Sequence, residues 1–221
     1  MRIFNQAGLY LIAGVKGVGK TSFTISILDE LQEQYEKKHS IYCYTATNIE
    51  KLPDKTDRIK MIEVSELPIQ TGHLFLEAEW TKCDHGLSAV IVDDFRYLLR
   101  TELFRDIELK KHEKILYILT RLKTLSEVYD VPVILTCEVD DDYIYGRSDK
   151  RPLVSDIPDH KYIKAFSDRI ILMHRDEMFT AASEKKGITE FRVHYIPEEA
   201  CRDYTYTYIS EKERYCSIEI N

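Results

Sequence analysis

An apolar run that passes directly into a glycine-rich turn is the feature that most constrains the fold of this chain. Residues 9–13 read L-Y-L-I-A, and residues 14–21 read G-V-K-G-V-G-K-T. The second run has the spacing G-x-x-x-x-G-K-[ST], whose glycines allow backbone N–H groups to converge on phosphate oxygens. Apolar residues then recur at helical spacing over residues 21–35. A strand, this turn and a helix, in that order, predict a phosphate-binding loop.

The chemistry of the loop predicts a nucleoside triphosphate with Mg²⁺ as its ligand. Lys20 is expected to reach the β- and γ-phosphates, and the hydroxyl of Thr21 to bind the metal. The positive N-terminal end of the following helix faces the same phosphates. The alternative is a glycine-rich turn without a ligand. We therefore predict ATP or ADP with Mg²⁺; the predicted nucleotide-binding residues are Gly14, Val15, Lys16, Gly17, Val18, Gly19, Lys20, Thr21 and Ser22.

Composition and charge narrow the classes of function. The 221 residues are 44% hydrophobic, which suits one substantial core, and residues 1–221 are expected to form a single domain. A formal net charge of -7 argues against binding nucleic acid through overall charge, although a local basic groove stays open. Five cysteines without a C-x-x-C pair fit reduced thiols. No apolar run is long enough to cross a membrane, so we expect a cytoplasmic protein with no membrane partner.

Strand and helix signals alternate along the chain, which predicts an α/β fold with a mostly parallel central sheet and helices on both faces. Strands are predicted at residues 9–13, 41–45, 59–64, 88–93, 131–136 and 170–173, and helices at residues 21–35, 71–82 and 115–129. Short alternating strands follow at residues 190–196, 204–209 and 215–220. These last segments predict antiparallel strands at the C-terminal end.

A pair of aspartates follows the apolar run at residues 89–92. In a parallel sheet, Asp93 then lies at the carboxyl end of a strand, which is the ligand-binding edge of such folds. We predict that Asp93 holds Mg²⁺ together with Thr21, as a Walker B aspartate does. The alternative is a plain strand end. Asp94 is expected to be an exposed residue at that strand end, and the alternative is a second group of the metal site.

Two segments of the C-terminal half resemble the motor domain of DnaB-type replicative helicases. Residues 151–157 read R-P-L-V-S-D-I and residues 168–177 read D-R-I-I-L-M-H-R-D-E, where that family has R-P-x-x-S-D-L, a helix, a strand and R-D-E. The resemblance runs from about Gly8 to Gly187 and implies a RecA-like P-loop NTPase. It also implies ATP hydrolysis in DNA replication or recombination, and its catalytic residues here are Lys20, Asp93 and Glu138.

Several positions depart from the family pattern. The catalytic glutamate of the family aligns with Thr47, and Glu50 is the nearest carboxylate. Glu138 stands at the family's glutamine sensor, where it would repel a γ-phosphate unless it is protonated or acts as a base. Lys185 aligns with the finger that enters a neighbouring subunit's nucleotide site, and it keeps the charge but not the bidentate fork of arginine. Hydrolysis is therefore less directly implied than nucleotide binding.

Two loops of the resembled family face DNA, and they correspond here to residues 96–114 and 139–150. Cations and aromatic residues mix in both, which suits single-stranded DNA because cations meet phosphates and rings stack on bases. The alternative for the first loop, which also contains acidic residues, is a solvated, salt-bridged helix, and the alternative for the second is a mobile surface loop. The predicted DNA-facing residues are Arg96, Arg100, Arg105, Arg147 and Lys150.

The sequence leaves functions of different classes open. The first is a compact DnaB/RecA-like ATPase that self-associates or meets other replication proteins. The second is a degenerate, non-hydrolysing nucleotide-binding module that loads or regulates another replication protein. A P-loop kinase for a small molecule is a third, but no lid-like arginine cluster supports it.

Overall fold

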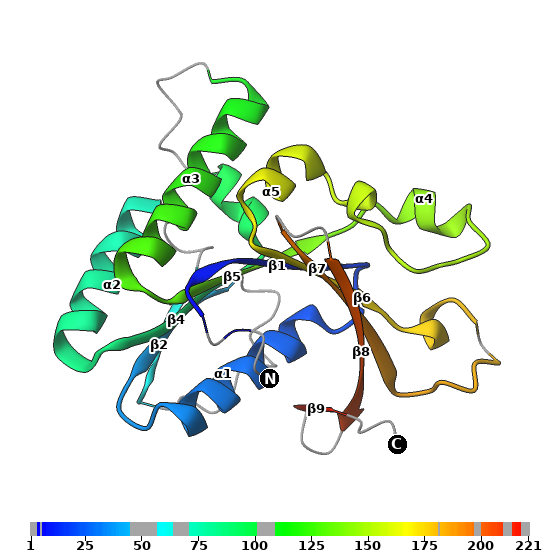
Figure 1. Cartoon of the computed structure of the whole chain (residues 1–221), viewed down its shortest axis with the longest axis horizontal. Coiled ribbons are helices and arrows are strands. Elements are labelled where there is room, and N and C mark those ends of the chain that lie inside the picture. Colours follow the sequence, from blue (N-terminus) through cyan, green and yellow to red (C-terminus); the bar gives the residue numbers. More distant parts are fainter. Residues whose placement is uncertain are drawn as a thin grey trace.

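One sheet organises the molecule. The computed structural model describes residue 4 and residues 6–44, 57–63, 71–100, 109–180, 182–196, 200–209 and 214–217. Within these ranges the sheet has nine strands in the order β3-β2-β4-β5-β1-β6-β7-β8-β9. Strands β1 to β6 pair in parallel, and β6 to β9 pair antiparallel. Figure 1 shows the parallel part and the antiparallel part as two ends of one twisted surface.

The strands are β1 (Gly8–Gly14), β2 (His39–Tyr44), β3 (Ile59–Glu63), β4 (Leu87–Asp93), β5 (Pro132–Glu138), β6 (Arg169–His174), β7 (Ile188–Tyr195), β8 (Ala200–Ile209) and β9 (Arg214–Ser217). The helices are α1 (Lys20–Gln34), α2 (Thr71–His85), α3 (Lys111–Tyr129), α4 (Asp141–Tyr145) and α5 (His160–Phe166). Short 3₁₀ helices are η3 (Phe95–Arg100), η5 (Val154–Asp156) and η6 (Asp176–Met178). The predicted α/β class and every predicted strand and helix are confirmed, with ends displaced by a few residues.

Helix α3 shows why element ends are harder to predict than elements. Its apolar face is buried, as the helical spacing predicts. The helix nevertheless begins at Lys111 rather than at residue 115, because its first turn is polar and carries no apolar period. The Glu113 carboxylate accepts a hydrogen bond from the Lys110 backbone N–H at 2.7 Å and so caps that turn. Asp130 ends the helix in the left-handed conformation, with φ 55°.

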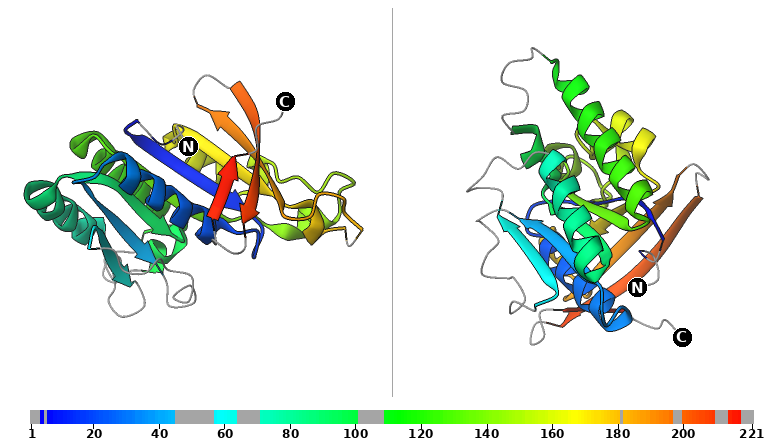
Figure 2. Two further views of the ribbon diagram at one scale, coloured as in Figure 1. Left: turned by 90° about the horizontal axis from the view of Figure 1, so that it is seen from below. Right: turned by 90° about the vertical axis from the view of Figure 1, so that its left-hand side faces the viewer.

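Helices cover both faces of the sheet. Helix α1 contacts β1 and β4 from one side, and α2 and α3 contact β1, β2, β4 and β5 from the other (Figure 2). Strands β1 and β4 are buried at every residue, because parallel strands between two helical layers meet no water. Both faces of these two central strands are thereby covered, and a ligand can reach them at their carboxyl ends.

The antiparallel end of the sheet curls back onto α1. Strand β9 contacts α1, and the Tyr215 backbone N–H donates to Ser26 Oγ at 3.0 Å. The Phe23 ring lies 4.5 Å from the Phe191 ring and 5.5 Å from the Tyr215 ring, measured between centroids. These aromatic contacts join the C-terminal strands to the helix that follows the phosphate loop.

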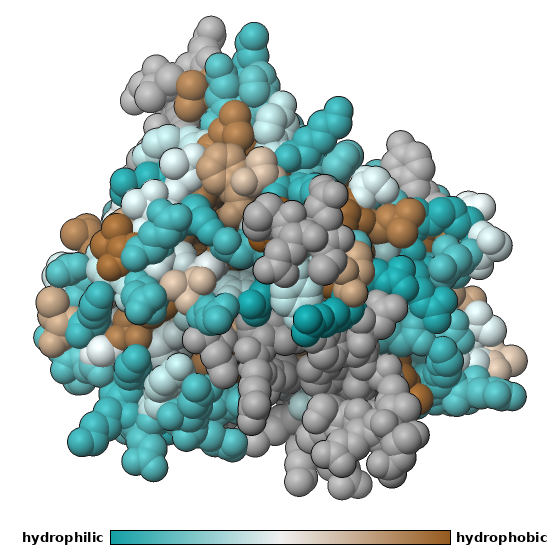
Figure 3. Space-filling model, in the orientation of Figure 1, coloured by the Kyte–Doolittle hydropathy of each residue, from teal (hydrophilic) through white to brown (hydrophobic). Residues whose placement is uncertain are grey.

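The surface carries no extended apolar face in the view of Figure 3, as far as the described residues show. Apolar side chains there form small patches that are separated by hydrophilic ones (Figure 3). In the described part of the chain, no helix is long and apolar enough to cross a membrane.

Candidate nucleotide-binding site

The predicted phosphate loop connects β1 to α1 at the carboxyl edge of the sheet. Gly17 and Gly19 have φ values of 81° and 103°, which side chains rarely adopt, so both positions require glycine. A Cβ atom on Gly14 would lie 2.8 Å from Val18 Cγ1 and 3.0 Å from the Met173 carbonyl oxygen. The loop therefore has the tight backbone path that the motif predicts, and Lys20 is the first residue of α1.

Lys20 lies inside this loop. Its Nζ donates hydrogen bonds to the carbonyl oxygens of Gly14 and Val15, each at 3.0 Å. Burial lowers the pKa of the Lys20 ammonium, and the carboxylates of Glu138, Asp94 and Asp93 oppose that shift. The amine is thus held at the end of the loop where phosphate oxygens are expected.

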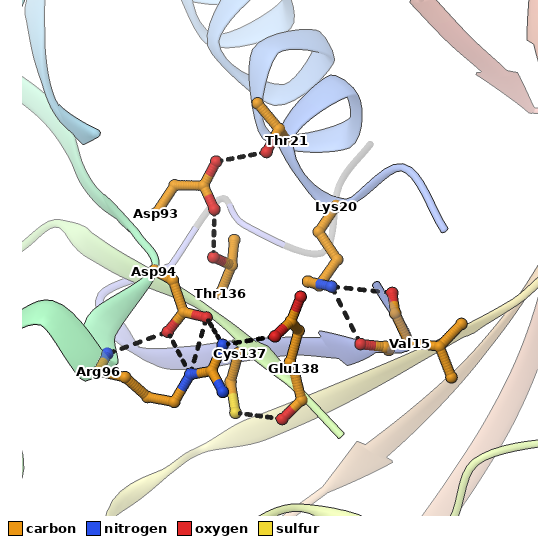
Figure 4. A network of polar contacts seen from close by, with 10 residues as sticks. Val15, Lys20, Thr21, Asp93, Asp94, Arg96, Thr136, Cys137 and Glu138 are labelled. Atoms are coloured by element: carbon orange, nitrogen blue, oxygen red, sulfur yellow. Dashed lines mark hydrogen bonds and ion pairs between the residues drawn. The ribbon is translucent and has the colours of Figure 1, made fainter. Parts of the chain in front are cut away.

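Thr21 and Asp93 meet across the sheet edge, as the sequence predicts. Thr21 Oγ1 donates to Asp93 Oδ2 at 2.6 Å, although the two residues are 72 positions apart in the chain. Figure 4 shows the pair between α1 and the end of β4. Hydroxyl and carboxylate oxygens are the ligands that Mg²⁺ prefers, so this pair fits a magnesium ion, which would neutralise phosphate charge.

Two further side chains hold Asp93, and sequence reasoning missed both. Thr136 Oγ1 donates to Asp93 Oδ1, and the Tyr42 hydroxyl donates to Asp93 Oδ2 at 3.0 Å. Asp93 is 3% exposed, so these hydrogen bonds satisfy a buried carboxylate. Burial and the Asp93 charge raise the pKa of Tyr42 well above its ordinary value, which keeps its hydroxyl proton in place. Thr136 stands two residues before Glu138, so both side chains lie on the same face of β5. This spacing was the only indication in the sequence that Thr136 lies near the site.

Glu138 belongs to an ion-paired group with Arg96 and Asp94 (Figure 4). Arg96 Nη2 lies 2.9 Å from Glu138 Oε2 and 2.6 Å from Asp94 Oδ2, and Arg96 Nε donates to both Asp94 oxygens. Burial raises the pKa of Glu138, but the hydrogen bond from Arg96 and the charges of Lys20, Arg96 and Lys16 outweigh it, and the net shift is downward. Glu138 is therefore ionised and neutralised by Arg96 rather than by a proton.

The prediction that Asp94 is exposed is wrong. Its side chain is only 13% exposed, because the Arg96 guanidinium covers it. The sequence placed Arg96 in a DNA-facing loop and so did not connect it with Asp94 two residues earlier.

Lys185, the predicted finger residue, lies just before β7. Its Nζ is 2.6 Å from Glu190 Oε1, and Arg151 Nε donates to Glu190 Oε2 at 2.7 Å. The Lys185 side chain remains 49% exposed. Its contact with a neighbouring subunit stays a prediction.

The predicted DNA-facing residues have different surroundings. Arg105 and the side chain of Arg100 lie outside the described residues. Thr47 and Glu50, the two positions considered for the catalytic glutamate, also lie outside them. Contact of these arginines with DNA stays a prediction.

The cations of the second loop are bound within the chain. Arg147 donates to both oxygens of Asp156, at 2.9 and 2.6 Å. Lys150 Nζ donates to the Tyr145 carbonyl oxygen at 2.6 Å. Neither contact tests whether these residues, or Arg96, also meet DNA.

A comparison with protein families assigns this chain to a family. The family model described as "DnaB-like helicase C terminal domain" matches residues 43–216, well over half of the chain. The chain belongs to this family. The matched range begins after the phosphate loop, so the loop itself rests on its sequence motif and its geometry. Membership confirms the resemblance to the motor domain of replicative helicases.

Relatives of this DnaB-like chain are replicative helicases. "Replicative DNA helicase DnaB" of Haemophilus influenzae is 24% identical over 222 residues, covering 82% of this chain and 45% of that protein. The protein of the same name from Geobacillus stearothermophilus is 21% identical over 218 residues, covering 85% and 47%. The chain therefore spans about half the length of these relatives.

Solved structures share the fold of this DnaB-like chain. "The Structure Of A DnaB-Like Replicative Helicase And Its Interactions With Primase" aligns with a TM-score of 0.78 and 17% identity, covering 98% of this chain and 58% of that one. A second solved structure, described as an "ATPase Domain", aligns with a TM-score of 0.75 and 17% identity, covering 96% and 85%. This likeness confirms the predicted RecA-like fold.

Proposed function

We propose that this chain is a single-domain ATPase of the DnaB type, which binds ATP with Mg²⁺ and hydrolyses it in DNA replication or recombination. The observation that carries the proposal is the 2.6 Å hydrogen bond between Thr21 of the phosphate loop and Asp93 at the end of β4. It brings the two predicted metal ligands together beside Lys20. Helicases of this family depend on nucleotides and generally use Mg²⁺.

Each residue of the site has a separate task in this proposal. The loop N–H groups and Lys20 hold the β- and γ-phosphates, and Thr21 and Asp93 hold the metal. Tyr42 and Thr136 keep the Asp93 carboxylate in position. The family relatives favour a motor over a module that only loads another protein. We also propose that the chain works in the cytoplasm, on single-stranded DNA, and in contact with copies of itself or other replication proteins.

A nucleotide titration tests the proposal. ATP with Mg²⁺ is expected to raise the unfolding temperature of the wild-type chain, since a ligand at 100 times its Kd stabilises by about 2.7 kcal/mol. Lys20→Ala should lose this shift. Lys37→Ala should retain it, because Lys37 is exposed in the turn after α1, at the opposite edge of the sheet.

Turnover is measured on the same proteins. Phosphate release is expected from the wild-type chain, faster with single-stranded DNA, and none is expected from Asp93→Asn. A wild-type chain that shows no thermal shift with either ATP or ADP would refute nucleotide binding. Binding without turnover, with or without DNA, would favour the non-hydrolysing module.

A further inference from the structure

An arginine of the chain itself lies beside the nucleotide site, paired with a carboxylate that faces the same space as Lys20. We propose that Arg96 and Glu138 form a sensor pair that distinguishes a nucleoside triphosphate from a diphosphate. In this arrangement Arg96 leaves Glu138 and binds the terminal phosphate, and it stays paired with Glu138 when only a diphosphate is present. The inference rests on the proposed nucleotide binding and adds the residues that select the bound nucleotide.

The position of Glu138 is set by the first residue of the phosphate loop. Gly14 of β1 is opposite Glu138 of β5 in the parallel register, and the Val139 N–H donates to the Gly14 carbonyl oxygen at 3.2 Å. Among the charged neighbours of Lys20, Glu138 has the strongest influence on its pKa. Figure 4 shows the Lys20 amine and the Glu138 carboxylate directed into the same space. A terminal phosphate that Lys20 binds would therefore lie near a carboxylate.

The Arg96 guanidinium is fixed by Asp94 but keeps a nitrogen available for a further acceptor. Asp94 binds its Nε and Nη2 at distances between 2.6 and 3.1 Å, so the guanidinium has a fixed base. Nη2 reaches Glu138, whereas Nη1 donates to none of the described residues. A guanidinium can therefore exchange the carboxylate of Glu138 for a phosphate without losing its contact with Asp94.

The Arg96–Glu138 pair is exposed enough to exchange. The Arg96 side chain is 39% exposed and the Glu138 side chain 34%, and ion pairs at this level of exposure contribute little to stability. A dianionic terminal phosphate repels Glu138 and attracts Arg96, so both charges favour the exchange. A bound diphosphate places no terminal phosphate near Glu138, so the ion pair between Arg96 and Glu138 stays formed.

Nucleotide affinities measured on four proteins test the pair. Dissociation constants for ADP and for a non-hydrolysable ATP analogue, both with Mg²⁺, are compared for the wild type, Arg96→Gln, Arg96→Lys and Glu138→Gln. Arg96→Gln should weaken the analogue about tenfold, as expected for a charged hydrogen bond, and should change ADP less than about twofold. Arg96→Lys should recover part of the loss because it restores charge without the fork. Glu138→Gln should strengthen analogue binding, because it removes both the carboxylate that competes for Arg96 and the negative charge that repels the terminal phosphate.

Coupling between the two residues is the sharper readout. In the Glu138→Gln background, Arg96→Gln should still weaken the analogue several-fold, because the guanidinium binds the phosphate itself. No loss in that background would show that Arg96 only neutralises Glu138 and would overturn the sensor pair. Arg202→Gln is the matched control: Arg202 is an exposed arginine on β8, three strands from β1. It should leave both affinities and their ratio at the wild-type values.

The outcomes separate this inference from the proposed function. An unchanged ratio of analogue to ADP affinity in Arg96→Gln, or an equal loss for both nucleotides, overturns the sensor pair while nucleotide binding stands. A wild-type chain that binds neither nucleotide overturns the proposed function and the sensor pair with it. Thermal unfolding of each variant without nucleotide shows whether its fold is intact, and Arg96→Lys provides the comparison if Arg96→Gln does not fold.

Discussion

Two loops follow the neighbouring strands β4 and β5 at the same edge of the sheet, and both contain arginine and aromatic residues. In the loop after β4, Arg96 pairs with Asp94 and Glu138, and the Glu138 side chain is 34% exposed. In the loop after β5, Arg147 pairs with Asp156, whose side chain is 4% exposed. The difference is that Arg96 has one exposed partner, Glu138, whereas the carboxylate that binds Arg147 is buried. An exposed partner can be exchanged for a ligand, whereas a buried partner fixes the arginine as part of the fold.

The largest expected effect comes from the buried partner. Asp156→Ala should lower the free energy of unfolding by about 2–3 kcal/mol, because it leaves Arg147 without its counterion. It also leaves the Leu153 N–H without its acceptor. Urea unfolding measures the change, and Asp149→Ala, which removes a 65% exposed carboxylate nearby, should cost less than about 1 kcal/mol. Equal stabilities for the two variants would show that burial is not what separates the loops.

The phosphate loop also makes a hydrogen bond to a buried side chain, Tyr215. The Tyr215 hydroxyl donates to the Val18 carbonyl oxygen at 3.3 Å, and Tyr215 is 5% exposed. Tyr215→Phe should lower the free energy of unfolding by about 0.5–1 kcal/mol while preserving the ring contacts. By the comparison above, it should leave the ratio of ATP-analogue to ADP affinity unchanged. A changed ratio of the two affinities, together with an unchanged free energy of unfolding, would contradict the view that buried contacts affect stability rather than nucleotide selection.

DNA binding gives a smaller effect and tests whether the loop after β5 meets DNA. Lys150→Gln should weaken binding of single-stranded DNA a few-fold and lower the salt slope by about 0.7, if its ammonium contacts one phosphate. Lys37→Gln, on the opposite edge of the sheet, is the control and should change neither. A salt slope in Lys150→Gln equal to that of the wild type would remove Lys150 from the DNA-facing set.

The smallest effect is the acid dependence of the exposed pair. The folded-state pKa of Glu138 lies below its ordinary value of 4.5, so the pair adds stability above that pH. This contribution is lost as the pH falls through the lowered folded-state pKa. Urea unfolding between about pH 3 and 6 should therefore show a slightly steeper acid loss for the wild type than for Glu138→Gln, by less than about 1 kcal/mol. Identical pH profiles would show that Glu138 is not ion-paired in solution.

Local patterns predicted the parts of the site that depend on neighbours in the chain. The path of the loop follows from Gly17 and Gly19, and the start of α1 at Lys20 follows from the helical spacing behind it. The place of Asp93 at a strand end follows from the apolar run before it. A parallel sheet then brings such strand ends to one edge, which is why the pairing of Thr21 with Asp93 could be predicted from the sequence.

Contacts across the sheet could not be predicted in this way. Tyr42 and Thr136 lie on strands whose alternation shows only that they are buried on one face or the other. Their common partner Asp93 depends on the strand order, in which β4 lies between β2 and β5. The predicted strand ends at residues 45, 64 and 218–220 lie outside the described residues.

The sequence by itself determined the glycine-rich loop, its lysine, the proposed metal ligands and the α/β class, because each depends on spacing along the chain. Only the tertiary structure decided that Arg96 turns toward Glu138 and that Tyr215 reaches Val18. The physical reason is that an ion pair or a buried hydrogen bond depends on which side chains the fold brings within about 3 Å, and composition does not contain that information.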